Sequence, residues 1–271
     1  TGSCFERDLP HLQELIDESQ GSQTDPFPRE MVDKIAEYVG MHPHPFGAAE
    51  WKQYFQVDVG PEPEFKNGFE AWWNGPDPID PSKFVYETHL PPILAPQFLS
   101  NEQGTLPRSL ATLEKMGLKF YGEHHRSFRP IKNHVVAEPS HWLVMRKDVL
   151  ARRGNGQRNR SWEKQVQYMK DLNEKKAAGY ETEPSMIDLA TVIFAHYAWT
   201  GEKYLGDWKG MEGRTTLSYC REYIRAFHMY EIRIPFAFGG VDNCINGKIS
   251  VFVTYGRDNS SVTGIAAVRK F

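Results

Sequence analysis

The chain has 271 residues, of which 40% are apolar and 13% aromatic, so it can bury a sizeable core and is not expected to be disordered. Its formal net charge of −3 is unevenly distributed, because residues 1–90 carry 17 acidic and 6 basic side chains, or −11, which leaves +8 for the remainder. This pattern predicts an acidic N-terminal part and a more basic body, and it argues against a general nucleic-acid-binding protein.

The three cysteines, Cys4, Cys220 and Cys244, include no CxxC pair, so neither a disulfide framework nor a cysteine zinc site is expected. No stretch approaches about 18 consecutive apolar residues, and no signal-peptide-like apolar segment occurs. We therefore expect no membrane segment and a cytoplasmic location, either in a bacterium or in the cytosol of a host cell to which a dedicated secretion system delivers the protein.

The N-terminal part is predicted to be helical. Apolar side chains recur on one stripe in residues 9–19 and again in residues 28–39, which is typical of amphipathic helices. A short third helix is predicted at residues 48–55, AAEWKQYF. We expect a helical N-terminal segment, residues 1–55, followed by a main α+β domain, residues 56–271.

Residues 56–108 are rich in proline and in aromatic residues. We predict an irregular segment there that packs against the body of the protein and is interrupted by one strand at residues 83–90, KFVYETHL. A helix is predicted at PRSLATLEKMG, with Pro107 at its start and Gly117 as its C-terminal cap.

The next part of the chain gives one strand signal and two helix signals. HWLVMRKDVL, residues 141–150, predicts a strand, and residues 161–179 predict a helix with apolar residues at helical spacing. The helix at residues 185–200 begins with Ser185 and Asp188 in capping-box spacing and is apolar on nearly all sides. We expect this second helix to be the central buried one.

The last part of the chain changes to a period of two. Apolar and polar residues alternate in residues 228–238 and 248–255, and residues 261–268 are predicted as a further strand. Asn246-Gly247 is the pair typical of a two-residue type I′ hairpin. An antiparallel meander is therefore predicted, which makes the fold class α+β, with buried helices packed on a C-terminal sheet.

Several blocks of the sequence resemble an uncharacterised protein family of chlamydia-like, amoeba-associated bacteria over residues 28–271. These blocks are THLPP (88–92), SHWLVMRKDVL (140–150), SWEKQ (161–165), LATVIFAHYAWTGEKY (189–204) and GIAAVRKF (264–271). The sequence departs from the family where TTLSYCRE replaces a typical WTYTRCQE, so that Tyr219 stands in place of an arginine. The resemblance implies a shared fold and an intracellular-bacterial setting, and it supplies no catalytic residues.

FPREMVDKIAEYVG, residues 27–40, resembles the opening of an F-box, whose amphipathic helix docks onto an adaptor of ubiquitin ligases. Pro28, Glu30, Ile35 and Tyr38 fall on that pattern. A full F-box needs about three helices, whereas PHPFG interrupts the helical pattern here. Any capped amphipathic helix shows much of the same pattern.

The stretch FEAWWNGPDPIDP contains two candidate ligand-contacting residues, Trp72 and Trp73. Adjacent side chains point in different directions, so we expect one tryptophan to pack inward and the other to be partly exposed, unless the pair forms a surface on which a ligand stacks. Asp77 and Asp80 each precede a proline, and we expect them to accept local backbone hydrogen bonds in a turn.

RRGNGQRNR contains four arginines and no acid, with two glycines that allow backbone amides to face an anion. Arg152, Arg153, Arg158 and Arg160 are therefore candidates for binding an anion, a nucleic-acid backbone or an acidic partner, and the alternative is a solvated loop.

Cys220 is the one cysteine that invites interpretation as a nucleophile, with His89, His141 or His196 as its base. The alternative is that Cys220 is a small buried apolar residue, as a free cysteine on a strand usually is, and His196 in the apolar helix is a core histidine. The histidine pairs lack HExxH spacing, so no metal site is predicted. GxGxxG, P-loop and GxSxG motifs are absent, which excludes the readily recognised nucleotide-binding and α/β-hydrolase classes, and no cofactor is predicted.

Three functions remain open at this point. The first is a non-enzymatic protein-interaction module that acts through its acidic N-terminal helices and its proline-rich segment, with the host cell as one setting. The second is a cysteine-dependent hydrolase or transferase centred on Cys220. The third is anion or nucleic-acid binding through the loop from Arg152 to Arg160.

Overall fold

The computed structural model describes residues 43–66, 68–121, 132–147, 162–202, 217–226, 232–245, 248–255, 263–264 and 266–271, together with Lys34, Tyr38 and Met41; for the segments between residues 217 and 264 it describes the backbone. The predicted helix at residues 9–19, most of the F-box-like helix, the arginine loop and the Asn246-Gly247 turn lie outside these residues.

The centre of the fold is helix α9, Met186–Thr200. Ser185 caps its N-terminus, because the Ser185 hydroxyl accepts a hydrogen bond from the Asp188 amide, and Gly201 ends it with a φ of 71°. Its first eleven residues, Met186–His196, are all buried. The prediction of a central buried helix is confirmed.

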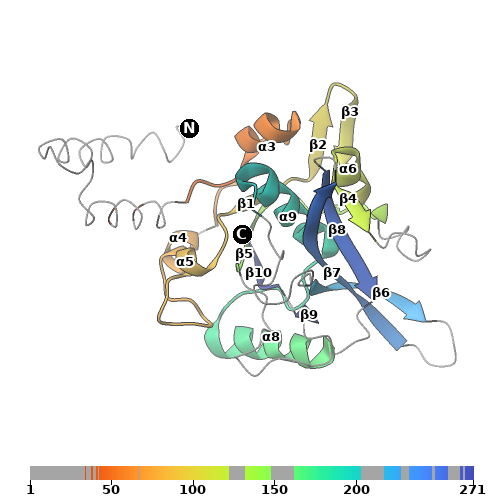
Figure 1. Ribbon diagram of the computed structural model, residues 1–271. Coiled ribbons are helices and arrows are strands. Elements are labelled where there is room, and N and C mark those ends of the chain that lie inside the picture. Colours follow the sequence, from red (N-terminus) through yellow and green to blue (C-terminus); the bar gives the residue numbers. More distant parts are fainter. Residues whose placement is uncertain are drawn as a thin grey trace, which may run out of the picture.

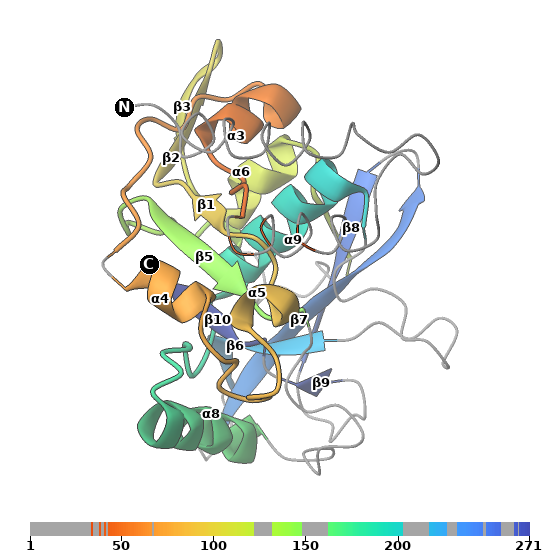
Figure 2. The ribbon, with the colours of Figure 1, turned by 90° about the vertical axis from the view of Figure 1, so that its left-hand side faces the viewer.

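Helix α9 lies between two sheets (Figures 1 and 2). On one side is a three-stranded antiparallel sheet in the order β1 (Ile93–Ala95), β5 (His141–Met145) and β10 (Val268–Lys270). In this register Leu94 lies opposite Trp142, and Lys270 lies opposite Leu143. The strand predicted from residue 141 is confirmed as far as Met145.

On the other side of α9 lies a five-stranded sheet in the order β4-β8-β7-β6-β9. The bounds of its strands are Lys119–Tyr121 (β4), Leu217–Ala226 (β6), Ile232–Ile245 (β7), Lys248–Tyr255 (β8) and Thr263–Gly264 (β9). β7 and β8 pair antiparallel, as predicted for residues 228–238 and 248–255. The third strand of the meander is β6, which was not predicted, and β4 and β9 add in parallel. The protein therefore has an α+β fold.

The single strand predicted at residues 261–268 is wrong. β9 pairs with β6 in the large sheet, and β10 crosses to the small sheet and pairs with β5. Because Ala266, Ala267 and Val268 are all fully buried, this stretch carries no alternation that would have shown the change of sheet.

The proline-rich segment contains more regular structure than predicted. It forms helices α4 (Phe69–Trp73) and α5 (Val85–Thr88), strand β1, and a hairpin of β2 (Phe98–Asn101) and β3 (Gly104–Pro107). The strand predicted at residues 83–90 is wrong, because the Glu87 carboxylate accepts a hydrogen bond from the Phe84 amide and closes a helical turn. Burial of Val57, Phe69 and Leu90 confirms that the segment packs on the body.

Three further helices complete the described chain. α3 (Ala48–Phe55) packs on α9 through stacking of Phe55 on Phe194, and α8 (Trp162–Lys176) lies at the opposite end of the fold (Figures 1 and 2). α6 spans Leu110–Lys115 and begins three residues later than predicted, because Pro107 still belongs to β3 and Ser109 is the N-cap. The domain boundary at residue 55 stays a prediction. None of the helices described is both long and apolar enough to cross a membrane.

Candidate functional site: a charge cluster at the N-terminus of helix α9

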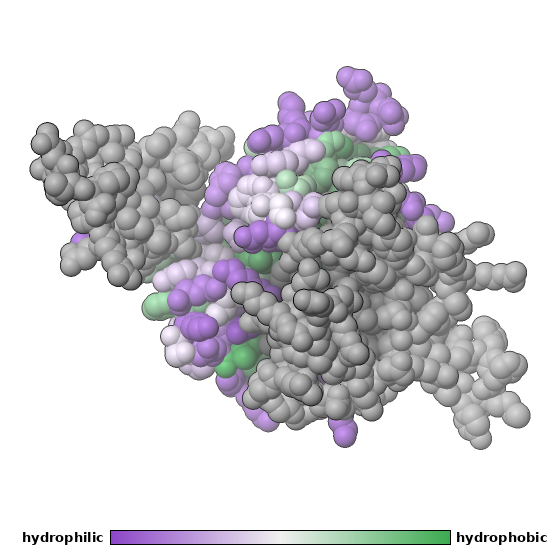
Figure 3. Space-filling model, viewed as in Figure 1, coloured by the Kyte–Doolittle hydropathy of each residue, from purple (hydrophilic) through white to green (hydrophobic). Residues whose placement is uncertain are grey.

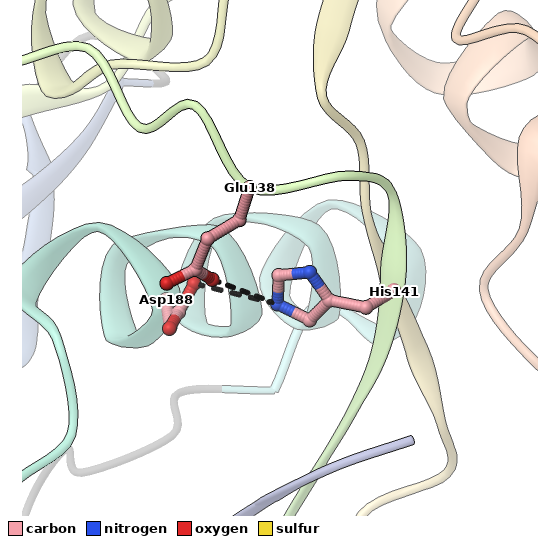
Figure 4. Close-up of side chains that lie close together, drawn as sticks. All are labelled: Glu138, His141 and Asp188. Carbon is pink, nitrogen blue, oxygen red and sulfur yellow. Dashed lines mark ion pairs between the residues drawn. The ribbon is translucent and has the colours of Figure 1, made fainter.

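Three side chains from separate elements converge beside the first turn of α9 (Figure 4). Asp188 lies in that turn, His141 begins β5, and Glu138 lies in the segment that precedes β5. Each offers one ligand atom, and these atoms all lie within 4.8 Å of one another. His141 Nε2 is 3.8 Å from Glu138 Oε2 and 3.9 Å from Asp188 Oδ1. We call these residues, with Arg108, Glu181 and Lys270, the α9 cluster.

Two permanent cations belong to the α9 cluster. Arg108, which is fully buried, donates from Nη1 to Asp188 Oδ1 at 2.6 Å. Lys270 Nζ lies 2.8 Å from Glu138 Oε2, 2.9 Å from Asp188 Oδ2 and 3.2 Å from Glu181 Oε1. Three carboxylates and two cations give the cluster a net charge of about −1 when His141 is neutral.

Two carboxyl groups of the α9 cluster, those of Asp188 and Glu138, have pKa values below their ordinary ones. Burial would raise the pKa of Asp188, but Arg108 and Lys270 outweigh it and bring that pKa to about 2. Burial likewise opposes ionisation of Glu138, whose pKa is nevertheless lowered by its hydrogen bond to Lys270 and by the charge of Lys270. The charged form of Lys270 is stabilised in turn: burial would lower its pKa, but Asp188 and Glu138 raise it above the ordinary value.

His141 has a defined tautomer. Its Nδ1 lies 2.8 Å from the Pro139 carbonyl oxygen, which can only accept, so Nδ1 carries the proton and Nε2 carries a lone pair. Burial lowers the pKa of His141 and keeps the ring neutral. Nε2 is buried and receives no hydrogen bond from any residue that the structure describes. An imidazole acceptor therefore faces two carboxylates.

Arg108 is the second member of the α9 cluster with unmatched polar atoms. Its Nε and Nη2 are buried and find no hydrogen-bond acceptor among the described residues, and Nη2 stays 4.0 Å from Glu138 Oε2. Buried polar groups in native proteins are almost always paired, so such exceptions are associated with bound ligands, ions or water. Chemically, the cluster offers one neutral nitrogen base, carboxylate oxygens and guanidinium donors within a few ångströms.

A second polar cluster lies around Asp77, and every side chain that forms it is buried. We call it the Asp77 cluster, formed by Asp77, Thr88, His89, Arg146 and Tyr180. The Asp77 carboxylate accepts hydrogen bonds from the amides of Ile79 and Asp80, from the Thr88 hydroxyl and from Arg146. The predicted role of Asp77 in a local turn is confirmed, and its pairing with Arg146 adds a long-range link.

His89 is locked within the Asp77 cluster. Its Nδ1 donates to the Val85 carbonyl at 3.0 Å, and its Nε2 therefore accepts from the Tyr180 hydroxyl at 2.9 Å. Burial lowers the pKa of His89 to about 4, so the ring is neutral at physiological pH. With both nitrogens engaged, His89 has no free lone pair for activating a thiol.

The two adjacent tryptophans separate as predicted. Trp73 is buried in the main core, whereas Trp72 is half-buried between the two hydrophobic clusters. The Trp72 ring meets the His89 ring edge to face, and the Arg269 guanidinium lies 4.6 Å from the centroid of Trp72. The protein's own side chains therefore cover the face of the Trp72 ring that Arg269 contacts. Trp73 is a core residue, as the packing interpretation predicted.

The structure does not bring the predicted catalytic histidines together, since His89 belongs to the Asp77 cluster and His141 to the α9 cluster. The backbone of Cys220 lies on β6, next to a shift in the β6–β7 register, but the structure does not describe its side chain. The four arginines of the predicted anion-binding loop lie outside the described residues: Arg152, Arg153, Arg158 and Arg160. The roles predicted for these five residues stay predictions.

Sequence reasoning missed most of the α9 cluster. Asp188 drew attention as a helix-capping residue, but its carboxylate turns to Arg108 and Lys270. Arg108, Glu138 and Lys270 follow no spacing motif, because they approach Asp188 from positions 50 to 82 residues away. The one available signal was an ionisable residue in the first turn of a helix that is otherwise apolar nearly all round.

Comparison of the chain with protein-family models, with curated proteins and with solved structures finds no match.

Proposed function

We propose that this protein is a non-enzymatic protein-interaction module that binds a partner through its proline-rich segment. Support comes from His89 and His141, two of the three candidate bases for Cys220, whose rings face other groups. Where Figure 3 displays described residues, polar side chains dominate and apolar ones form small separate patches. A binding surface on this protein would therefore be small and built around a few apolar side chains.

The single observation that carries the proposal is a stacked aromatic pair at the N-terminus of α5, formed by the exposed N-cap residue Phe84 and by Tyr86. Phe84 is 42% exposed and stacks on Tyr86 with a centroid distance of 5.3 Å and an interplanar angle of 8°. Exposed large aromatic side chains are rare on the described surface, and such residues supply most of the energy at protein interfaces.

The aromatic pair is held rigidly in place. Its loop is closed by hydrogen bonds from the Asp77 amide to the Lys83 carbonyl and from the Phe84 amide to Glu87. The Asp77 cluster fixes the base of that loop to β5 through Arg146. A preorganised aromatic surface loses little conformational entropy on binding, which favours a function in recognition.

The partner expected from this chemistry is a protein that inserts an apolar side chain against the Phe84 and Tyr86 rings. A photoreactive phenylalanine analogue placed at residue 84 should crosslink to this partner in lysate of the native cell. The same analogue at Tyr54, which is 39% exposed on α3, is the matched control and should not crosslink to it.

The identified partner then permits a quantitative test with purified proteins. Phe84→Ala should weaken binding about 30-fold, since removal of an aromatic anchor costs about 2 kcal/mol, and Tyr86→Ala should have a similar effect. Tyr54→Ala should change the dissociation constant less than about threefold. Equal crosslinking from both positions, or a Phe84→Ala variant that binds every crosslinked protein normally, refutes the proposal.

A further inference from the structure

We infer that Glu138, His141 and Asp188 form a binding site for a divalent transition-metal ion with mixed nitrogen and oxygen preference, such as Mn²⁺ or Zn²⁺. This inference is independent of the proposed protein-interaction function. It rests on the mutual orientation of the three side chains, on the charge of the α9 cluster and on its unmatched polar atoms.

The distances in the α9 cluster suit a small cation. Two ligand atoms of a tetrahedral Zn²⁺ are about 3.4 Å apart. His141 Nε2 lies 3.8 and 3.9 Å from the nearest carboxylate oxygens, and the three ligand atoms all lie within 4.8 Å of one another. Binding therefore requires these atoms to approach one another by up to about 1.4 Å, which the partly exposed Glu138 can do through its rotatable bonds. One imidazole and two carboxylates, with water in the remaining positions, is a ligand set suited to these ions.

His141 is oriented as metal-binding histidines usually are. In such residues one ring nitrogen donates to a backbone carbonyl or carboxylate, which fixes the ring and leaves the other nitrogen for the metal. Here Nδ1 donates to the Pro139 carbonyl and Nε2 points toward Glu138 and Asp188.

The electrostatics of the α9 cluster call for a cation beside Nε2. The neutral His141 Nε2 lone pair faces two carboxylate oxygens at 3.8 and 3.9 Å and receives no hydrogen bond from any described residue, although Lys270 and Arg108 donate to the carboxylates themselves. This arrangement is repulsive unless a proton or a metal ion lies between the three groups. A cluster that served only as an ion pair would need no imidazole in this position.

Lys270 is the competitor of the metal ion. Its ammonium group contacts the same two carboxylates, at 2.8 Å and 2.9 Å, so a metal ion must displace it. Glu181 Oε1, at 3.2 Å, can keep the ammonium paired after it moves. Removing the charge of Lys270 should therefore strengthen metal binding. At a metal site that did not include these two carboxylates, the same substitution would leave the affinity unchanged.

The test uses the full chain without an affinity tag, stripped of metal with EDTA and then titrated with Mn²⁺ under electron paramagnetic resonance. We expect one bound Mn²⁺ per chain and a nitrogen coupling from a directly bound imidazole. His141→Asn keeps a side-chain donor for the Pro139 carbonyl and removes the lone pair. Since second-shell partners alone are worth about 10–100-fold in metal affinity, loss of this ligand should weaken binding at least about 100-fold.

Matched variants make the test specific. His134→Asn is the same substitution on an exposed neighbouring histidine and should bind Mn²⁺ as the wild type does. Lys270→Met should bind about tenfold more tightly, and Mg²⁺ and Ca²⁺, which prefer all-oxygen sites, should compete poorly. Melting curves in EDTA verify that each variant is folded. Absence of saturable Mn²⁺ binding to the wild type, or binding to His141→Asn that equals it, overturns the inference.

Discussion

Replacing Arg146 with methionine is expected to destabilise the protein by about 3 kcal/mol. Arg146 donates to the Asp77 carboxylate, whose side chain is fully buried, so the variant leaves a buried charge without its counter-ion. Removing one partner of a buried ion pair costs about 3–5 kcal/mol. The lower end applies because the amides of Ile79 and Asp80 and the Thr88 hydroxyl still donate to Asp77.

Urea denaturation followed by tryptophan fluorescence measures this loss, and a thermal melt should show a decrease in Tm of about 6–12 °C. Asp77→Asn in the Arg146→Met background removes the unpaired charge and should restore at least about 1 kcal/mol, as a double-mutant cycle detects. Lys175→Met is the control, since its ion pair with Asp171 is exposed and should contribute less than about 0.5 kcal/mol. A loss below about 1 kcal/mol for Arg146→Met, or no restoration by Asp77→Asn, refutes the reasoning.

Three further predictions concern individual residues. Burial lowers the pKa of His89 from 6.5 to about 4, so between these pH values the unfolded chain binds a proton at this residue that the folded protein does not. The contribution of His89 to stability should be complete above pH 6.5 and fall by about 3 kcal/mol by pH 4. In urea titrations His89→Asn should remove this part of the pH dependence and leave the smaller part that comes from His141 and His196, whose pKa values burial also lowers. Gly179→Ala should destabilise the protein by more than the roughly 1 kcal/mol expected for Gly201→Ala. Both glycines have a positive φ, but only at Gly179 would a Cβ atom meet a side chain, at 2.9 Å from Arg269 Cζ. Equal unfolding free energies of the two variants would contradict this prediction. If Cys220 has no activating base, native alkylation by iodoacetamide should show an apparent pKa near 8.5 or above, and a value below about 7 would favour the cysteine-enzyme hypothesis.

Local sequence patterns predicted the elements whose hydrogen bonds and burial are set locally. Helix α9 was recognisable because Ser185 caps it, Gly201 ends it and its residues are apolar nearly all round. Strands β7 and β8 of the meander were recognisable from their period of two, whereas β6 was not predicted. The same reasoning failed at residues 83–90, where KFVYETHL suggested a strand. The Glu87 carboxylate accepts a hydrogen bond from the Phe84 amide and the Asp77 carboxylate accepts one from the Thr88 hydroxyl, and these bonds outweigh the strand preference of the side chains.

The candidate site was only partly predictable, since its contacts are long-range. His141 was identified as chemically interesting, but its partners on Glu138 and Asp188 were not. Arg108 and Asp188 are 80 residues apart, and Lys270 and Glu138 are 132 apart, so no spacing rule connects them. Such contacts follow from how the sheets pack around α9, which sequence periodicity does not specify.

Strand β10 contributes a side chain to the surroundings of each polar cluster. The two clusters differ in whether their buried polar atoms are paired, and for this reason we assign a structural role to the Asp77 cluster and a bound ligand to the α9 cluster. Adjacent side chains on a strand point to opposite faces, so Arg269 covers Trp72 beside the Asp77 cluster while Lys270 enters the α9 cluster. In the Asp77 cluster the carboxylate and both histidine nitrogens have partners, which is the condition for a buried network that only stabilises. In the α9 cluster His141 Nε2 and two Arg108 nitrogens lack a partner within the described chain. An unmatched buried polar atom destabilises a fold by about 1–3 kcal/mol. A cation can satisfy the lone pair of His141 Nε2, so this acceptor favours a bound cation in the α9 cluster, whereas the two Arg108 nitrogens are donors and carry no such argument.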